Sequence, residues 1–162
     1  MLSNTQIETL FEYKADKFYN RVSRGSVKAG TLAGYNANDG YRRVCIQKKY
    51  YYIHRLIWQL LVGEIEDGLF IDHIDGDRLN NSISNLRLAT ARENQQNKFR
   101  QKVGTSAYKG VWWDAKKNVW KASFRTAEKR IYLGQFESEL EAAGTYDEMA
   151  KVHHGEFAKL NL

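Results

Sequence analysis

Residues 70–97, FIDHIDGDRLNNSISNLRLATARENQQN, constrain the possible fold more than any other part of the chain. Phe70–Ile74 predicts a short strand, and Leu86–Ala89 predicts a second one. The stretch between them is rich in Asn and Asp, which hydrogen-bond their own backbone and are typical of turns. Thr90–Glu93 has the spacing of a capping box, so a helix is expected from there to about Phe99. The segment therefore predicts strand, loop, strand and helix in immediate succession.

The preceding residues predict a hairpin followed by a helix. Tyr41–Ile46 and Tyr50–Ile53 are rich in β-formers and flank a short polar stretch, which indicates two paired strands. His54–Val62 then places its apolar residues on one helical face. Residues 1–40 are less informative, with a short helix expected near Ile7–Tyr13.

The last part of the chain predicts a second small domain. Tyr108–Trp113, Val119–Arg125 and Arg130–Leu133 predict three short strands joined by polar turns, and a capping box at Ser138 predicts a helix after them. A sheet packed on one amphipathic helix buries both apolar faces. We therefore predict an α+β protein with three parts: a nuclease-like domain over 1–97 (core 54–97), a basic linker over 98–106 and a sheet-and-helix domain over 107–162.

Charge is unevenly distributed along the chain. Residues 98–133 hold ten lysines and arginines against two carboxylates, whereas residues 134–162 hold two lysines against six carboxylates. A basic segment followed by an acidic one indicates one face turned to a polyanion and another turned away. A solvated charged surface is the alternative interpretation.

Composition excludes several other classes of protein. No run of about 18 apolar residues is present, so we expect no membrane span. The first residues lack the basic and apolar regions of a secretory signal. Cys45 is the single cysteine, which excludes an internal disulfide and argues against a thiolate zinc site. We expect a soluble, cytoplasmic protein.

The predicted strand–loop–strand–helix segment carries residues suited to phosphodiester hydrolysis. His73 is a suitable base for water near pH 7, and Asp72 is a hard oxygen ligand for Mg²⁺ or Mn²⁺. The Asn94 amide oxygen, in the first turn of the predicted helix, could supply a second metal ligand. Asn85 could hold His73 in one orientation and tautomer. Because Asp72 and His73 are adjacent on a strand, their side chains should project to opposite sides of it.

Ordinary structural explanations exist for most of these residues. An Asp-His pair is often structural, and Asn80, Asn81 and Asn85 could serve only as turn residues. Tyr50–Tyr52 and Arg42–Arg43 fit either a DNA contact or a hairpin with alternating buried tyrosines. The joint spacing of the aspartate-histidine pair and the two asparagines after it favours the nuclease hypothesis.

Residues 54–97, with HRLIW followed by IDHIDGDRLNNSISNLRLATARENQQN, resemble the phage-type HNH endonucleases. The resemblance implies a strand–strand–helix unit that holds one divalent ion, Mg²⁺ or Mn²⁺, and no structural zinc. It implies a general base at His73, metal ligands at Asp72 and Asn94, and a central asparagine at Asn85. His54 and Asn97 also match the pattern. The resemblance implies a structural role for His54 and a less defined role for Asn97.

Residues 105–162 resemble the Apetala-two/ethylene-response-factor DNA-binding domain. The matching landmarks include YKGV at 108–111, YLG at 132–134 and the closing LNL at 160–162. The resemblance implies a three-stranded sheet in the DNA major groove with a helix behind it. It places DNA contacts at Lys109, Trp112, Arg125, Arg130 and Tyr132. Strand alternation adds Lys121 to the outward face, where a lysine can hold a phosphate. Trp112 and Asp114 stand where plant members have arginines, so the plant recognition sequence does not carry over.

These features predict a metal-dependent, homing-type DNA endonuclease whose C-terminal sheet binds double-stranded DNA. We expect a phage-encoded monomer or weak dimer that acts in a bacterial host cell. The rival hypothesis is a DNA-binding transcription regulator with an inactive nuclease domain. A non-specific degradative nuclease is a third, and a dedicated DNA-reading domain makes it less attractive.

Overall fold

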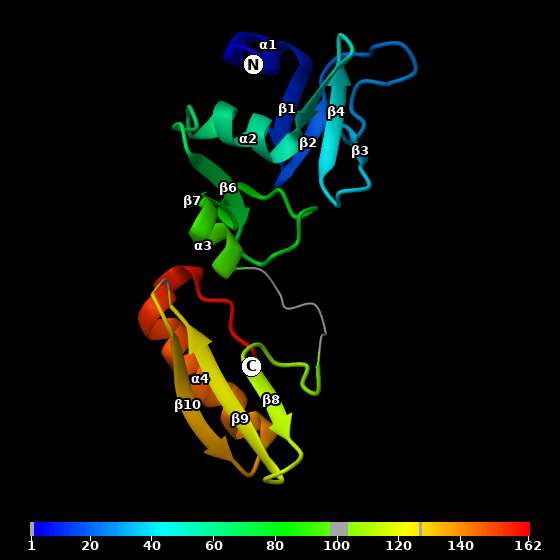
Figure 1. Ribbon diagram of the computed structural model, residues 1–162. Helices are drawn as coiled ribbons and strands as arrows, with labels where there is room; N and C mark the ends of the chain where they lie inside the picture. The colour runs from blue at the N-terminus through cyan, green and yellow to red at the C-terminus, as the bar shows by residue number, and fades with distance from the viewer. Residues whose placement is uncertain (1, 98–103, 127) are drawn as a thin grey trace. The chain divides into compact units, whose positions relative to one another are not determined.

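The computed structural model describes residues 2–97, 104–126 and 128–162, and these form two compact units, Met1–Ala91 and Arg92–Leu162 (Figure 1). Both units mix short helices with small antiparallel sheets. The predicted mixture of helices and small sheets is confirmed. No helix in the described parts of the chain is long and apolar enough to cross a membrane.

The first unit begins with helix α1 (Asn4–Leu10), whose N-terminus carries a capping box between Ser3 and Gln6. The bounds predicted for this helix were wrong, because the chain leaves it to form β1 (Phe11–Lys14). β1 pairs in antiparallel register with β2 (Lys17–Asn20). The change of conformation buries Phe11 completely and stacks its ring on Phe18 with 4.7 Å between centroids.

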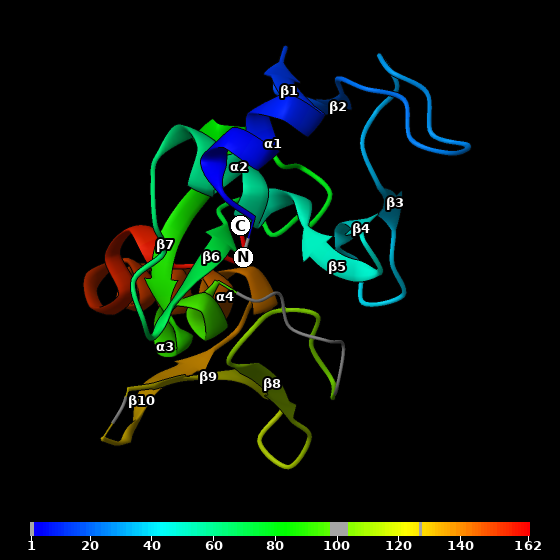
Figure 2. The same ribbon diagram turned by 90° about the horizontal axis from the view of Figure 1, so that it is seen from above.

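A three-stranded sheet and a second helix follow. The sheet has the order β3 (Tyr35–Asn36), β4 (Arg42–Ile46) and β5 (Lys49–Tyr52), so the predicted hairpin is present. Helix α2 (Ile53–Leu61) begins directly after β5 and buries one apolar face. Helix α1 lies against α2 (Figure 2), and the side chain of Gln59 donates to the carbonyl of Leu2 at 2.7 Å.

Residues 70–97, the part of the sequence that most constrains the fold, form a two-stranded ladder followed by a helix. Strand β6 (Leu69–His73) pairs antiparallel with β7 (Leu86–Thr90), and the 3₁₀ turn η1 (Ile83–Asn85) precedes β7. Helix α3 (Ala91–Gln96) follows β7 without a gap. Phe99, where the helix was expected to end, lies outside the described residues.

The core of the first unit joins these elements. Most of its fully buried members come from α1, β1 and α2, and Ile71 of β6, Leu86 of β7 and the fully buried Ala33 before β3 pack against them. Tyr13 of β1 ties the loop before β7 to this core, because its hydroxyl accepts the backbone N–H of Ile83 at 2.9 Å. The core therefore supports the β6–β7 ladder through the packing of Ile71 and Leu86 and through the hydrogen bond of Tyr13.

The second unit is a three-stranded antiparallel sheet with one long helix behind it (Figure 1). Its strands have the order β10 (Arg130–Phe136), β9 (Val119–Arg125) and β8 (Val111–Asp114). Helix α4 (Glu139–His154) starts at the N-cap Ser138, and the turn η2 (Gly155–Phe157) follows it. The core between sheet and helix consists of small and aromatic side chains, with Val111, Ala122, Phe124, Ala142, Ala143, Tyr146 and Ala150 buried.

Close packing at Gly110 sets the distance between the sheet and α4. A Cβ atom there would lie 2.3 Å from the ring of Tyr146 and 2.5 Å from the carbonyl oxygen of Ser123, and the φ angle is +78°. Only glycine fits both the space and the backbone conformation.

The predicted linker, 98–106, is described only in its last three residues. The Thr105 hydroxyl accepts the backbone N–H of Trp113 at 2.8 Å, and the Ser106 hydroxyl accepts that of Tyr108 at 2.9 Å. Ser106 is also almost completely buried. Residues 105 and 106 therefore pack as part of the second unit, and residues 98–103 lie outside the described chain.

Candidate active site on the β6–β7 ladder

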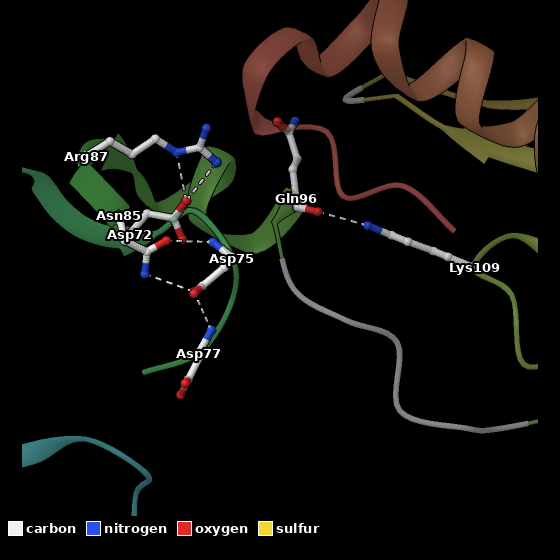
Figure 3. Close-up of polar contacts among 7 residues, drawn as sticks. All are labelled: Asp72, Asp75, Asp77, Asn85, Arg87, Gln96 and Lys109. Carbon is white, nitrogen blue, oxygen red and sulfur yellow. Dashed lines mark hydrogen bonds and ion pairs between the residues drawn. The ribbon is translucent and has the colours of Figure 1, made fainter. Parts of the chain in front are cut away.

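Asp72 lies near the end of β6, opposite Arg87 of β7 in the strand register. The Asp72 side chain is 4% exposed, and its Oδ2 accepts hydrogen bonds from Arg87 Nε at 3.0 Å and from a terminal guanidinium nitrogen at 2.9 Å (Figure 3). A carboxylate taken out of water is costly unless it is paired, and this ion pair supplies the partner and fixes the orientation of the Asp72 side chain.

His73 is buried on the other face of β6. Its Nε2 lies 3.0 Å from Oδ1 of Asn81, in the loop that joins the two strands. Its ring packs edge-on against the ring of His54 from α2, with 5.1 Å between centroids, and at 6.0 Å from Tyr41. As the alternation of a strand requires, Asp72 and His73 project to opposite sides, and a different set of neighbours holds each one.

His54 is a neutral, buried ring beside His73. Burial lowers its pKa to about 3, and the nearby His73 and Arg55 contribute in the same direction. Its Nδ1 is buried and makes no hydrogen bond to any residue that the structure describes. Aromatic rings on two further sides, Tyr41 at 5.2 Å and Tyr52 at 5.3 Å, complete its surroundings. This packing agrees with the structural role that the family resemblance implied for His54.

Asn85 braces the loop after β6. Its amide oxygen accepts the backbone N–H of Asp75 at 3.0 Å, and its amide nitrogen donates to the Asp75 carboxylate at 2.9 Å (Figure 3). The amide nitrogen also donates to the carbonyl of Asn80 at 2.9 Å. Burial opposes ionisation of Asp75, but hydrogen bonds from Asn80 and Asn85 outweigh it and hold the pKa of this carboxyl below its usual value. These contacts fix the turn through which the chain leaves His73.

Asn94 lies in α3, four residues after the end of β7. It belongs to the second compact unit, whereas Asp72, His73 and Asn85 belong to the first. Asn97, directly after α3, is buried at 4% exposure. The two asparagines are therefore placed by the helix that follows the ladder in the chain.

The predicted DNA-contact residues separate into two sets. Four are open at the surface of the sheet: Trp112 and Tyr132 are the large exposed aromatic side chains of β8 and β10, and Arg125 and Arg130 are exposed at facing positions of β9 and β10. These side chains are available to a ligand of the sheet.

Lys109 and Lys121 are instead engaged within the second unit. Lys109 Nζ donates to the carbonyl of Gln96 at 3.0 Å (Figure 3), and burial lowers the pKa of its ammonium group. Lys121 pairs with the carboxylate of Asp114 at 2.5 Å, and this contact raises the pKa of Lys121. Of the two, Lys121 lies on the sheet, in β9.

The sequence analysis did not identify two residues of the site as functional positions. Arg87 is the partner of Asp72, and Asn81, expected only as a turn residue, is the partner of His73. A charged residue in the second predicted strand was visible in the sequence, but only the strand register places Arg87 opposite Asp72.

Buried, adjacent aspartate and histidine on a two-stranded ladder that runs into a helix define a class of protein, the nucleases with a ββα active site. The HNH endonuclease family model matches residues 51–96, the stretch from β5 to the end of α3. The chain belongs to the HNH endonuclease family and is a DNA-cleaving hydrolase.

Relatives from phages and a giant virus support this assignment. The chain is 35% identical over 106 residues to "Protein 3.8" of Escherichia phage T7, covering 65% of this chain and 87% of that protein. It is 37% identical over 110 residues to "Uncharacterized HNH endonuclease L560" of Acanthamoeba polyphaga mimivirus, covering 67% and 56% of the two chains. It is also 37% identical over 79 residues to "DNA endonuclease I-HmuI" of Bacillus phage SP01, covering 46% of this chain and 45% of that protein. The chain thus spans about half the length of the last two relatives.

One solved structure is also similar, "DNA binding and cleavage by the HNH homing endonuclease I-HmuI". It matches at 30% identity over 59% of this chain and 49% of that one, with a TM-score of 0.40.

Proposed function

We propose that this protein is a metal-dependent, homing-type DNA endonuclease in which His73 is the general base and Asp72 and Asn94 hold one divalent cation. The observation that carries the proposal is the buried pair at the end of β6, in which Arg87 holds Asp72 and Asn81 holds His73. Asn85 keeps the turn after His73 in one conformation. A base held in one orientation by packing and hydrogen bonds is what general base catalysis requires.

The chemistry of the two proposed ligands, the Asp72 carboxylate and the Asn94 amide oxygen, suits a hard divalent cation. Among the described residues, no three His, Cys, Asp or Glu side chains lie close enough to hold a metal ion. Mg²⁺ commonly binds to one or two protein oxygens and takes its other ligands from water and substrate phosphate. One carboxylate and one amide oxygen are sufficient for such a site, and a single cysteine argues against a zinc site built of thiolates.

The protein residues would divide the reaction between them. His73 takes a proton from the attacking water, which forms a bond to phosphorus as the bond to the leaving oxygen breaks. A Mg²⁺ or Mn²⁺ ion held by Asp72 and Asn94 would act as a Lewis acid and offset the negative charge that develops in the reaction. Arg87 pairs with the buried Asp72 carboxylate and holds it in one orientation. Because each chain has one such site, a monomer would nick one strand.

A plasmid-nicking assay tests the proposal. With Mg²⁺, the wild-type protein should convert supercoiled DNA to the nicked form, and a chelator should stop it. The His73→Ala variant should bind DNA but lose at least about 100-fold in rate, within the range that a general base contributes. A matched control is His153→Ala, which removes an exposed histidine of α4. Full cleavage by His73→Ala would overturn the assignment, and wild-type protein that binds without cutting would favour the regulator hypothesis.

We also propose that the sheet β10–β9–β8 binds the major groove of double-stranded DNA. The support is the exposed set on this sheet: two aromatic side chains, Trp112 and Tyr132, and two arginines, Arg125 and Arg130. Arginine can contact phosphate or pair with guanine, and residues 98–133 hold ten lysines and arginines against two carboxylates.

Salt dependence of binding tests this second proposal. Arg125→Ala combined with Arg130→Ala should weaken binding and reduce the slope of log K against log salt by about two, because each phosphate contact contributes about 0.9. The matched control is Lys14→Ala with Lys17→Ala, which removes two exposed cations of the first unit. An unchanged slope in the arginine variant would contradict the proposal.

The setting of the activity is also a proposal. Three of the relatives described above come from viruses, two of them phages of bacteria. We infer that the protein is phage-encoded and acts in the cytoplasm of a bacterial host as a monomer or weak dimer.

A further inference from the structure

Asn81 is buried beside the proposed catalytic base. It is 8% exposed and lies in the loop between β6 and η1. Its Oδ1 is 3.0 Å from His73 Nε2, and its Nδ2 donates to the backbone carbonyl of Leu79 at 3.2 Å. The side chain thus has one hydrogen-bonding partner at each end of its amide.

The contact with Leu79 determines which amide atom faces the histidine. If the amide were turned over, Oδ1 would face the Leu79 carbonyl oxygen, and two acceptors would repel each other. The amide nitrogen therefore faces Leu79 and the oxygen faces His73. Because an amide oxygen only accepts hydrogen bonds, the His73 nitrogen that faces it must carry a proton.

A neutral imidazole carries one proton. With that proton on Nε2, the lone pair that can accept a proton from water is on Nδ1. The rings of His54 and Tyr41 pack against the imidazole and restrict its rotation. Orientation and tautomer of His73 are therefore determined by two separate sets of contacts.

We propose that Asn81 is a positioning residue that keeps His73 in the tautomer protonated on Nε2, so that Nδ1 is the base of the cleavage reaction. The proposal deepens the proposed function, since it rests on His73 as the base. It differs from the sequence-based hypothesis, which gave this task to Asn85.

Nuclear magnetic resonance tests the tautomer without any need for activity. The full chain, labelled with ¹⁵N-histidine, has four histidines, and the His73→Gln variant identifies the signals of His73. In the wild type at pH 8, the two-bond ¹H–¹⁵N pattern should show the proton on Nε2. Asn81→Leu, similar in size but without an acceptor, should shift His73 toward a mixture of tautomers. Asn81→Asp keeps an acceptor oxygen and should keep the proton on Nε2.

Cleavage rates supply the second readout. Asn81→Leu should lower kcat about 10- to 100-fold, as is typical when an outer partner of a functional histidine is removed. Its KM for plasmid should stay within about twofold, because Asn81 orients a base and binds no DNA in this proposal. Asn81→Asp should recover part of the lost rate, and Ser82→Ala, which alters a half-buried neighbour in the same loop, should cut at the wild-type rate.

Two results would overturn the proposal: a wild-type His73 with its proton on Nδ1, or an Asn81→Leu variant with an unchanged tautomer in a folded protein. A His73→Ala variant that still cuts would overturn the proposed function instead. In that case the spectra of wild type and Asn81→Leu still decide whether Asn81 determines the tautomer.

Discussion

Acidification should destabilise the first unit through His54. This side chain is 6% exposed and is surrounded by Tyr41, Tyr52 and His73. Burial lowers the pKa of His54 to about 3 in the folded protein, against about 6.5 in an unfolded chain. Above pH 6.5 the ring is neutral in both states. Below pH 6.5 only the unfolded chain takes up the proton, so unfolding becomes more favourable as the pH falls.

The size of the effect follows from the two pKa values. The free energy of unfolding should fall by about 1 kcal/mol between pH 6.5 and 5.5, and by about 1.4 kcal/mol for each further unit until the folded pKa is approached. Most carboxyl groups titrate below this window, so histidines dominate it. Burial also lowers the pKa of His154, which adds a slope of the same sign in the second unit.

Urea unfolding at pH 8.0, 6.5 and 5.5 measures the slope. The methyl signals of Ile57, fully buried in α2, report on the first unit. The comparison variant is His54→Phe, which keeps an aromatic ring against Tyr41 and Tyr52 and cannot titrate. It should lose about 1 kcal/mol of pH dependence between pH 6.5 and 5.5. If wild type and variant had the same slope, the neutral buried state of His54 would be refuted.

Three further perturbations test the packing of the two units. Arg87→Met removes the guanidinium that pairs with the buried Asp72 carboxylate, and should lower the free energy of unfolding in urea by about 3 kcal/mol. Adding Asp72→Asn should recover part of this stability, and a loss below about 0.5 kcal/mol in the single variant would contradict the reasoning. Gly110→Ala forces a Cβ to 2.3 Å from the ring of Tyr146 at a φ angle of +78°, and should lower the stability of the second unit by about 3 kcal/mol; an unchanged melting temperature would refute the close contact. Ser138→Ala removes the N-cap of α4 and should cost about 1 kcal/mol, while Ser138→Asp should retain the stability.

Local pattern was enough to locate most of the elements. The segment around Asp72 was expected as strand, loop, strand and helix, and β6, β7 and α3 lie there within one or two residues over the described part. β9 begins and ends at the residues expected, Val119 and Arg125. These elements could be predicted because alternation, apolar periodicity and capping depend on residues that are close together in the chain.

The bounds of α1 show where local pattern fails. The periodicity of residues 7–13 suited a helix, but Phe11 continues into a strand because a partner strand and a ring at Phe18 become available only in the fold. Tertiary packing decides between two local conformations of similar energy.

The proposed active site divides in the same way. The sequence alone led us to propose Asp72 and His73, because an aspartate and a histidine at that place suit phosphodiester chemistry and their spacing to Asn85 and Asn94 resembles one family. It could not select their partners. Arg87 meets Asp72 only through the strand register, and Asn81 rather than Asn85 meets Nε2 of His73 only through the shape of the loop. Chemical identity is carried by single residues, whereas hydrogen-bond partners depend on distances that the folded chain alone defines.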